Sequence, residues 1–443
     1  MLQSSSVVPE MGNRMGQSGA HFNVGTKKKS SFLDFFKKKE TSVSLEGAFY
    51  LGDLSSGKPY YCTENQLGNH IEVVAAPGIV ADFLKNLISD RILHGHGLIV
   101  LNLKSEMGDW AVDIAKAAGR ESEMRLVSLG HPEHSVSYNP IQQGTAPEIH
   151  KLLMNSLDRS INWSMNGSMN GAINRNDEQI KNVSSTVLLT LLRSLCDYRD
   201  KTGDGFYLGK LYELLNVPGA LHEFYKKLIA AQCQVSVAMQ FLIQKLDLPA
   251  EREKLQPLVT LLRLLAPWVE GQSASFDFSE AIDESRILFF QLNERELQTT
   301  SQVYGKMVLQ DLMRLVQERY AEMNEGRASV KQVMLILDDY ASLAVPQFSE
   351  FMSFAKSANL SIVFVNPTRV EAQIESRAGT VLVVGPQTEE NAEYFSCLMG
   401  TSVKPVISPK KLMSFNSEEG FVETREMGEK ISADFIRLHA RPG

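Results

Sequence analysis

The feature that most constrains the fold is an alternation of short apolar runs with segments of helical periodicity. The helical segments include 82–93, 109–118 and 304–323. The apolar runs are 70–75, 97–103, 124–129, 286–292, 333–339, 360–366 and 379–385. Strands that alternate with helices along a chain form a parallel, doubly wound sheet. The sequence therefore predicts an α/β fold whose parallel sheet carries helices on both faces.

A leucine-rich region interrupts this alternation. Leucine recurs at helical spacing in VLLTLLRSL, KLYELL, FLIQKL and LVTLLRLL, and strand candidates are few. We predict an all-α insertion domain at 145–285, which separates the first half of the α/β domain (45–144) from the second half (286–443). Within the insertion, the tandem polar repeat SMNGSMNGAINRN at 164–176 predicts an exposed loop.

Residues 1–44 differ from the rest of the chain in composition. They are rich in Ser, Gly, Asn and Lys and lack periodicity, which predicts a disordered basic tail. Within the tail, segment 27–39 places three Phe and one Leu between two lysine triplets. Such a segment can dock on an anionic membrane surface, with about 1 kcal/mol from each lysine. It can equally bind a partner or keep the tail soluble.

Charge and composition exclude several classes of function. The net charge is −7, and because residues 1–41 carry seven basic and three acidic residues, the remainder carries −11. Such a body is a poor general binder of polyanions, so contact with nucleic acid would be local. No apolar stretch approaches the roughly 18 residues of a membrane span, and the N-terminus lacks a signal-peptide layout. We therefore expect a cytoplasmic protein.

Cysteine and histidine spacing gives no metal signature. Four cysteines form no CxxC or Cys/His pattern, which fits a reducing compartment. The histidine pairs His94/His96 and His131/His134 have no third ligand at a suitable spacing. We expect no metal site from these residues.

The segment 73–87 stands where a strand, a turn and a helix would form a phosphate-binding P-loop. In the pattern G-x-x-x-x-G-K-[ST], glycines let backbone N–H groups converge on the phosphates, the lysine reaches them, and the hydroxyl binds Mg²⁺. The alignment puts Ala75 and Val80 at the two glycines, Ala81 at the lysine and Asp82 at the hydroxyl residue. Only Gly78, inside the loop, remains as a relic.

Three effects in this loop oppose a bound phosphate. Pro77 has no N–H to donate, and the β-branched Ile79 and Val80 resist left-handed backbone angles. Charge is the largest effect, because the lysine is replaced by Ala81 and a negative charge is added at Asp82. At about 4 Å and an effective dielectric near 20, each unit charge is worth roughly 4 kcal/mol. The loop is therefore predicted not to hold a nucleotide.

A second motif follows in VMLILDDY, an apolar strand that ends in paired acids, as in a Walker B motif. In that motif the first acid holds Mg²⁺ and the second, normally Glu, orients the attacking water. Asp338 and Asp339 occupy these places. Acids at strand ends also cap the next helix, so this alternative stays open.

In the order of its landmarks, the chain resembles the type IV coupling proteins of conjugation and type IV secretion, the TraD/TraG and DotL-like branch of the FtsK/HerA motor ATPases. The resemblance runs from about Gly47 to Gly400. Besides the two motifs, its landmarks are GAFYLGD, Asn69-His70, NLKSE with Lys104, Gly119-Arg120, Tyr138-Asn139-Pro140, the segment 286–315, a sensor strand ending in Asn366, and AGTVLVVGPQTEENAEYF. The resemblance implies a RecA-like sheet interrupted by an all-α insertion domain, and assembly into a hexameric ring.

The departures from this family concern catalysis. The P-loop lysine is absent, Asn366 stands where glutamine is usual, and Asn102 stands where the family has Asp in D-P-K-G-D/E. The family's two N-terminal transmembrane helices have no counterpart, and the basic tail stands in their place. ATP and Mg²⁺ are therefore not expected as cofactors, and Asp338 and Asp339 are expected to be relics of a catalytic site.

Three functions agree with these patterns. The first is a pseudo-ATPase component of a conjugation or type IV secretion machine, acting as a structural or partner-recruiting subunit at the inner face of the bacterial inner membrane. Its expected partners are other components of the machine, including an active coupling protein. The second is an active motor that moves DNA or protein with ATP and Mg²⁺. The third is a DNA- or partner-binding module that uses the helical insertion and the polar repeat.

Overall fold

The computed structural model describes residues 48–438 except 55, 77–78, 105–106, 132–134, 158–174, 235–236, 267–275, 326–330, 399–407, 417 and 427–428. Predictions on the basic tail, on segment 27–39 and on Gly78 lie outside the described residues, as does the repeat at 164–176 up to residue 174. Its last two residues, Arg175 and Asn176, begin helix α5 (Arg175–Thr202) and so do not belong to the predicted loop.

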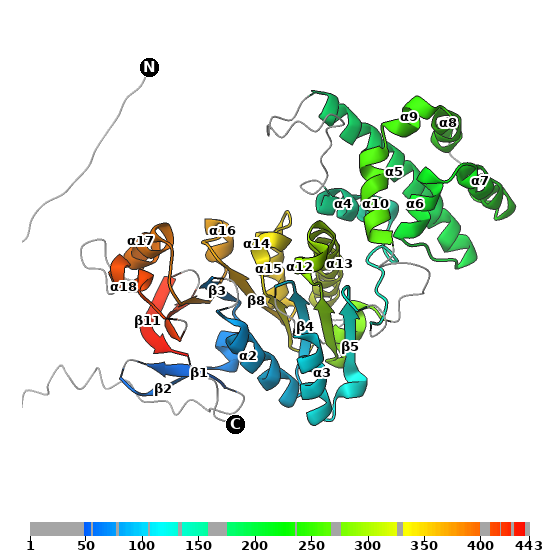
Figure 1. The fold of residues 1–443 in the computed structure, drawn as a ribbon. Helices are drawn as coiled ribbons and strands as arrows, with labels where there is room; N and C mark the ends of the chain where they lie inside the picture. The colour runs from blue at the N-terminus through cyan, green and yellow to red at the C-terminus, as the bar shows by residue number, and fades with distance from the viewer. Residues whose placement is uncertain are drawn as a thin grey trace, which may run out of the picture. The chain divides into compact units, whose positions relative to one another are not determined.

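The described strands form one mixed sheet of 11 strands in the order β2-β1-β11-β10-β9-β3-β8-β7-β4-β6-β5 (Figure 1). Their bounds are β1 Phe49–Leu54, β2 Pro59–Cys62, β3 Ile71–Ala75, β4 Gly97–Asn102, β5 Met124–Ser128, β6 Ile287–Gln291, β7 Val333–Leu337, β8 Leu360–Asn366, β9 Thr380–Val384, β10 Glu419–Glu426 and β11 Glu429–Arg437. Neighbouring strands from β9 to β5 in this order pair in parallel. Every apolar run predicted from the sequence forms one of these strands, which confirms the predicted parallel sheet.

Four strands extend the sheet in antiparallel fashion beyond β9: β10, β11, β1 and β2. The sequence predicts β1 through its family landmark but not β2, β10 or β11. The reason in β10 is that two of its buried positions hold charged residues. Glu423 and Arg425 are both buried and form an ion pair of 2.6 Å, so the strand lacks an apolar run that a pattern could reveal.

Helices cover both faces of the sheet and bury two separate apolar cores. On one face, α2 (Ala81–Leu93) and α3 (Gly108–Ala117) pack against the side chains of β3 and β4. On the other face, the core includes α13 (Thr299–Asn324), α15 (Phe348–Ser357) and α17 (Glu389–Leu398). Figure 1 shows α2 and α3 lying over the strands. Short helices α1 (Glu64–Leu67), α12 (Glu294–Leu297), α14 (Tyr340–Leu343), α16 (Ala372–Glu375) and α18 (Pro409–Met413) occupy the connections.

Between β5 and β6 the described residues form helices and no strand. These helices are α4 Ala146–Leu157, α5 Arg175–Thr202, α6 Leu208–Asn216, α7 Ala220–Ala230, α8 Val237–Leu246, α9 Pro249–Glu253, α10 Gln256–Leu265 and α11 Phe278–Glu284. Their buried leucines join the core that contains α13. Helix α4 is tied to α13 by a hydrogen bond of 2.6 Å from Gln310 Nε2 to Ser156 Oγ. None of the described helices is long and apolar enough to cross a lipid bilayer.

His70, a landmark of the sequence, joins three elements just before β3. Its Nδ1 accepts a hydrogen bond of 3.1 Å from the backbone N–H of Ile362, and its Nε2 lies 2.7 Å from the backbone oxygen of Met352. The ring is therefore neutral, with the proton on Nε2. Burial lowers the pKa of His70 to about 4.

Acid is therefore expected to weaken the fold through His70. In the unfolded chain the histidine takes up a proton near its usual pKa, whereas in the folded chain it does so only near pH 4. The stabilising contribution of neutral His70 to the free energy of unfolding is therefore complete above about pH 6.5 and is lost as the pH falls toward about 4. The full loss in the free energy of unfolding is about 3 kcal/mol. Urea unfolding at pH 7, 5.5 and 4.5 should show a steeper decline for the wild type than for His70→Asn, although the variant is less stable at pH 7. Parallel declines would show that His70 titrates normally.

Candidate functional site

The sheet topology brings the predicted site residues to one edge. Strands β3, β8, β7 and β4 are consecutive parallel neighbours, with Val74 opposite Asn366 and Leu101 opposite Leu337. The residues that follow parallel strands meet at the carboxyl edge of the sheet, where open α/β sheets commonly bind ligands. The turn after β3, Asn366 and the acids after β7 thus share the edge that the motifs predict, and we call it the carboxyl edge.

The turn between β3 and α2 has the length of the P-loop pattern, because β3 ends at Ala75 and α2 begins at Ala81. Its apolar side chains belong to the core. Val80 is 4% exposed and packs in the cluster that includes Ala75. Ile79 packs so closely against Gly385 that a Cβ added to the glycine would lie 2.8 Å from Ile79 Cδ1. Asp82 lies exposed in the first turn of α2.

Asp338 is buried and accepts hydrogen bonds from groups at the end of β4 and just after it. Its carboxylate accepts hydrogen bonds from Asn102 Nδ2 at 2.6 Å, from the Leu103 N–H at 2.7 Å and from the Lys104 N–H at 2.9 Å. Asp338 is only 7% exposed. In this arrangement Asp338 fixes the path of the chain after β4, and Asn102 contributes to the same contact.

Asp339 has two kinds of partner. It caps α14, where its carboxylate accepts from the Ser342 N–H at 3.4 Å and from Ser342 Oγ at 2.7 Å. The capping role that remained open from the sequence is therefore confirmed for this acid. Its Oδ2 also lies 3.2 Å from Lys104 Nζ.

Lys104 bridges Asp339 to a second acid, Glu294, with which it forms an ion pair. Burial opposes the charge of the lysine, but the hydrogen bonds and charges of the two acids outweigh burial and raise the pKa of Lys104. Gln302 Nε2 donates to the other carboxylate oxygen of Glu294 at 2.5 Å. Because β4 neighbours β7 and not β3, Lys104 lies beside the acids and not beside the turn that lost its lysine.

Glu294 and Gln302 lie within the landmark segment 286–315, which assigns neither of them a role, and the backbone around them is unusual. Helix α12, which carries Glu294, is bounded by Asn293 at φ 49° and Gln298 at φ 39°. Left-handed angles at residues other than glycine cost about 1–3 kcal/mol each and concentrate at functional sites. The polar residues between β6 and α13 form no sequence pattern that predicts this backbone geometry.

Asn366 ends β8, between the strand of the turn and the strand of the acids. It is 1% exposed, and neither Nδ2 nor Oδ1 has a hydrogen-bond partner among the described residues. Buried polar groups are nearly always paired, so this amide is a second unusual feature of the carboxyl edge.

A buried charge network lies beneath this edge, on the face covered by α16 and α17. It includes Glu72 of β3, which no motif indicates. Arg425 donates to Glu423 at 2.6 Å and to Glu375 at 3.1 Å, and the Tyr394 hydroxyl donates to Glu375 at 2.7 Å. Burial raises the pKa of Glu72 to about 8, with a further rise from Glu375 that Arg425 and Arg369 oppose.

The histidine pairs do not contribute to the carboxyl edge. His94 and His96 follow α2, where His94 Nδ1 lies 2.8 Å from the Asp90 backbone oxygen and His96 Nε2 lies 3.8 Å from Glu64. His131 is exposed, and His134 lies outside the described residues. Over the part of the chain that the structure describes, no three His, Cys, Asp or Glu side chains are grouped to hold a metal ion.

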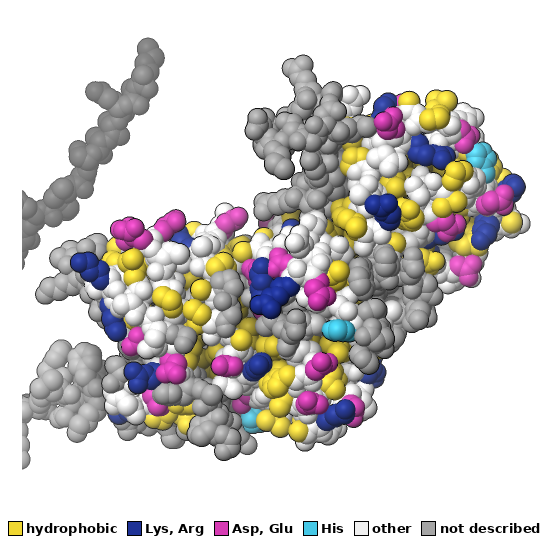
Figure 2. Space-filling model, in the orientation of Figure 1, with side chains coloured by type: hydrophobic (Ala, Val, Ile, Leu, Met, Phe, Trp, Pro, Cys, Tyr) yellow, Lys and Arg dark blue, Asp and Glu magenta, His cyan; other side chains and the backbone are white. Residues whose placement is uncertain are grey.

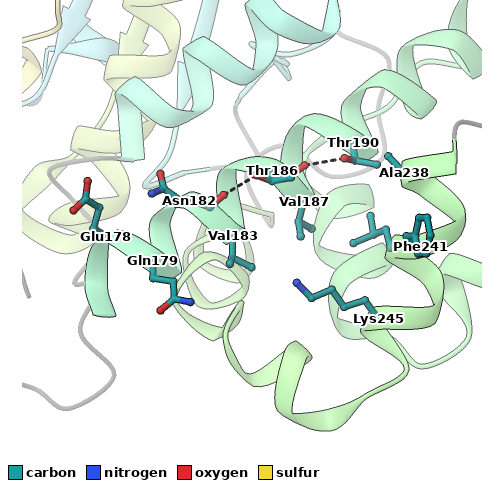
Figure 3. Close-up of a pocket in the computed structure, with 11 residues that line it drawn as sticks. Glu178, Gln179, Asn182, Val183, Thr186, Val187, Thr190, Ala238, Phe241 and Lys245 are labelled. Carbon is teal, nitrogen blue, oxygen red and sulfur yellow. Dashed lines mark hydrogen bonds between the residues drawn. The ribbon is translucent and has the colours of Figure 1, made fainter. Parts of the chain in front are cut away.

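Among the described residues, two larger cavities lie away from the carboxyl edge. One, of about 760 Å³, lies between α5 and α8, with Val183, Val187 and Leu242 in its wall and Glu178 and Lys245 among its charged residues (Figure 3). The other, of about 350 Å³, is lined by α4, α13 and α15. Neither is lined by a residue of the carboxyl edge. Figure 2 shows acidic and basic side chains interspersed over the face in view, without a broad basic surface.

Comparisons of the sequence alone find nothing: no protein-family model matches the chain, and neither does any curated protein sequence. The structure does have relatives. The bacterial conjugative coupling protein TrwB, in a trigonal form with sulphate, matches with a TM-score of 0.56 and 12% identity, over 88% of this chain and 89% of that one. TrwB in complex with a non-hydrolysable ATP analogue matches with a TM-score of 0.57 and 11% identity, over the same shares.

A further solved structure that matches is VirB4 of Thermoanaerobacter pseudethanolicus. It has a TM-score of 0.50 and 13% identity, over 89% of this chain and 96% of that one. At such identities a likeness reports on the fold, and it covers 88–89% of this chain. The chain therefore has the fold of the conjugative coupling proteins.

Proposed function

We propose that this protein is a coupling-protein-like component of a conjugation or type IV secretion machine that has lost ATP hydrolysis. It serves as a structural or partner-recruiting subunit. The observation that carries the proposal is that the chain's own side chains occupy the positions where a magnesium–nucleotide would be held. The coupling-protein fold supplies the context of the machine.

The turn before α2 supports this proposal. TrwB has been solved with ADP and Mg²⁺ and with an ATP analogue, so that protein binds nucleotide on this fold. Here α2 begins with Ala81 and the exposed Asp82, while Val80 is committed to the core. The change from a lysine to a nearby carboxylate alters the charge beside a phosphate by two units, or roughly 8 kcal/mol at 4 Å and a dielectric near 20.

The acids after β7 support it independently. A hard cation such as Mg²⁺ needs carboxylate oxygens that are open to it. The Asp338 carboxylate already accepts three hydrogen bonds, and Asp339 is engaged by Ser342 and Lys104. The residues present therefore do not fit a magnesium–nucleotide.

Nucleotide binding tests the proposal directly. Titration of the full chain with ATP and Mg²⁺ in a calorimeter should give no saturation tighter than about 1 mM, because the charge change removes most of the several kcal/mol that a micromolar complex requires. The matched variant is Asp338→Asn/Asp339→Asn, which should behave like the wild type. Micromolar affinity together with Mg²⁺-dependent turnover that the double variant abolishes would establish an active motor instead.

Partner recruitment is the positive side of the same proposal. The expected partners are other components of the machine, among them an active coupling protein with which this chain could assemble as an oligomer. A site at the inner face of the inner membrane, contacted through segment 27–39, is also part of the proposal. Contact with DNA is the alternative, and it would weaken steeply as salt rises from low to moderate concentration.

A further inference from the structure

Lys104 holds a place between two acids that come from different parts of the chain. It follows β4, Asp339 follows β7, and Glu294 belongs to α12. We propose that Lys104 is a built-in countercation, which pairs with Asp339 and Glu294 in the place of a bound divalent cation and so keeps this edge ordered without any ion. The inference rests on the proposed function, because it explains how a nucleotide-free edge remains stable.

The contacts of the two acids leave little room for another cation. Their side chains are 10% and 12% exposed, so they are largely removed from water. Lys104 Nζ lies 3.2 Å from Asp339 Oδ2 and pairs with Glu294 Oε2, while Ser342 and Gln302 donate to the same carboxylates. Mg²⁺ would need oxygen ligands at about 2.1 Å in octahedral geometry. The lysine and the neutral donors occupy those oxygens instead.

The backbone of Lys104 is held by the third acid of the edge. Its N–H donates to Asp338 at 2.9 Å, next to the Leu103 N–H, which donates to the same carboxylate. Asp338 thus holds the backbone of Lys104, while the Lys104 side chain pairs with Asp339 and Glu294. The single positive charge of Lys104 thus offsets part of the negative charge of the three acids at this edge of the sheet.

The strained backbone of α12 gives an independent reason to assign this role. Asn293 and Gln298 bound the helix with left-handed φ angles that persist only where surrounding contacts hold them. The ion pair with Lys104 and the hydrogen bond from Gln302 both attach Glu294 to neighbouring elements. Loss of the lysine would therefore weaken the attachment of α12 and leave the two carboxylates without a cationic partner among their described contacts.

The test replaces the lysine with an isosteric apolar residue and adds the missing cation back. Lys104→Met should unfold roughly 2–4 °C below the wild type in metal-free buffer. Mn²⁺ at millimolar concentration should restore most of that loss, and the variant should bind Mn²⁺ at least about tenfold more tightly than the wild type, as followed by electron paramagnetic resonance. The wild type should show no change in melting temperature on addition of Mn²⁺.

Two further variants separate this role from a merely structural one. Lys104→Arg keeps the positive charge and should behave like the wild type, whereas Lys104→Met/Glu294→Gln/Asp339→Asn should lose the gain in Mn²⁺ binding. If Lys104→Met folds only when prepared with Mn²⁺, the inference is supported, and if Mn²⁺ does not recover folded protein it is overturned. Equal Mn²⁺ binding by the wild type and Lys104→Met would also overturn it. No nucleotide is present in these assays, so their result is independent of whether the wild type binds ATP.

Discussion

Glu72→Gln is expected to raise the free energy of unfolding at pH 8 by about 4 kcal/mol and to change it little at pH 4.5. Glu72 is fully buried in β3, and burial raises its pKa from 4.5 to about 8. A glutamate in water ionises easily at these pH values, whereas the folded chain resists the charge. Glutamine keeps the shape of the side chain and removes the titration.

The sign follows from where the proton is bound. Because the folded pKa lies above the unfolded pKa, the contribution of Glu72 is complete below about pH 4.5 and is lost as the pH rises toward about 8. This direction is opposite to that of His70. Urea unfolding of the wild type and Glu72→Gln at half-unit steps from pH 5 to pH 8 should show curves that diverge steadily with pH.

The control for Glu72 is Glu393→Gln, which alters an exposed acid of α17 and should leave the curve unchanged. Parallel curves for the wild type and Glu72→Gln would mean that Arg425 neutralises Glu72 fully across this range. The prediction would then be wrong, although the fold would be unaffected.

Asp338→Ala is expected to lower the free energy of unfolding by about 3–5 kcal/mol. The change removes the acceptor of three donors: the buried Asn102 Nδ2 and Leu103 N–H, and the partly buried Lys104 N–H. Asp338→Asn should lose less, because an amide oxygen can still accept while its NH₂ group faces other donors. Urea unfolding at pH 7 with an unchanged m-value would measure the loss.

This experiment also separates a structural acid from a spare metal ligand. An acid kept only to bind Mg²⁺ would be repelled by Asp339 and Glu294, and its removal would leave stability unchanged or increase it. The control is Asp113→Ala on the exposed face of α3, which should shift stability by less than about 0.5 kcal/mol. A loss at Asp338 no larger than that of the control would contradict the structural role.

Much of the fold follows from local pattern. Six of the seven apolar runs become parallel strands that are buried on both faces, and the seventh, β5, lies at the sheet edge. Strands buried on both faces have continuous hydrophobic sequences, which a pattern can detect. The leucine spacing of 145–285 likewise predicts the helices found there. Strand β10 is not predicted because Glu423 and Arg425 are buried as a pair, and a hydrophobicity pattern assigns charged residues to the surface.

The candidate site was only partly predictable for a different reason. Asp338, Asp339, Asn366 and the turn at Ala75–Asp82 stand at motif positions, so pattern alone could place them at one edge. No sequence pattern assigns a role to Glu294. Its contact with Lys104 depends on α12, a short helix with strained backbone at both ends. Contacts between residues almost 200 positions apart leave no local trace.

The sequence by itself determined the class of fold, the order of its elements and the loss of the P-loop lysine, because each of these is written in residue type and spacing. Only the tertiary structure decided what the remaining acids do. The parallel pairing of β4 with β7 brings Asn102, Leu103 and Lys104 onto Asp338 and Asp339. In the sequence, Asp338 and Asp339 resemble a metal site. In the fold, Lys104 from just after the neighbouring strand pairs with Asp339, because Coulomb energy depends on distance in space and not along the chain.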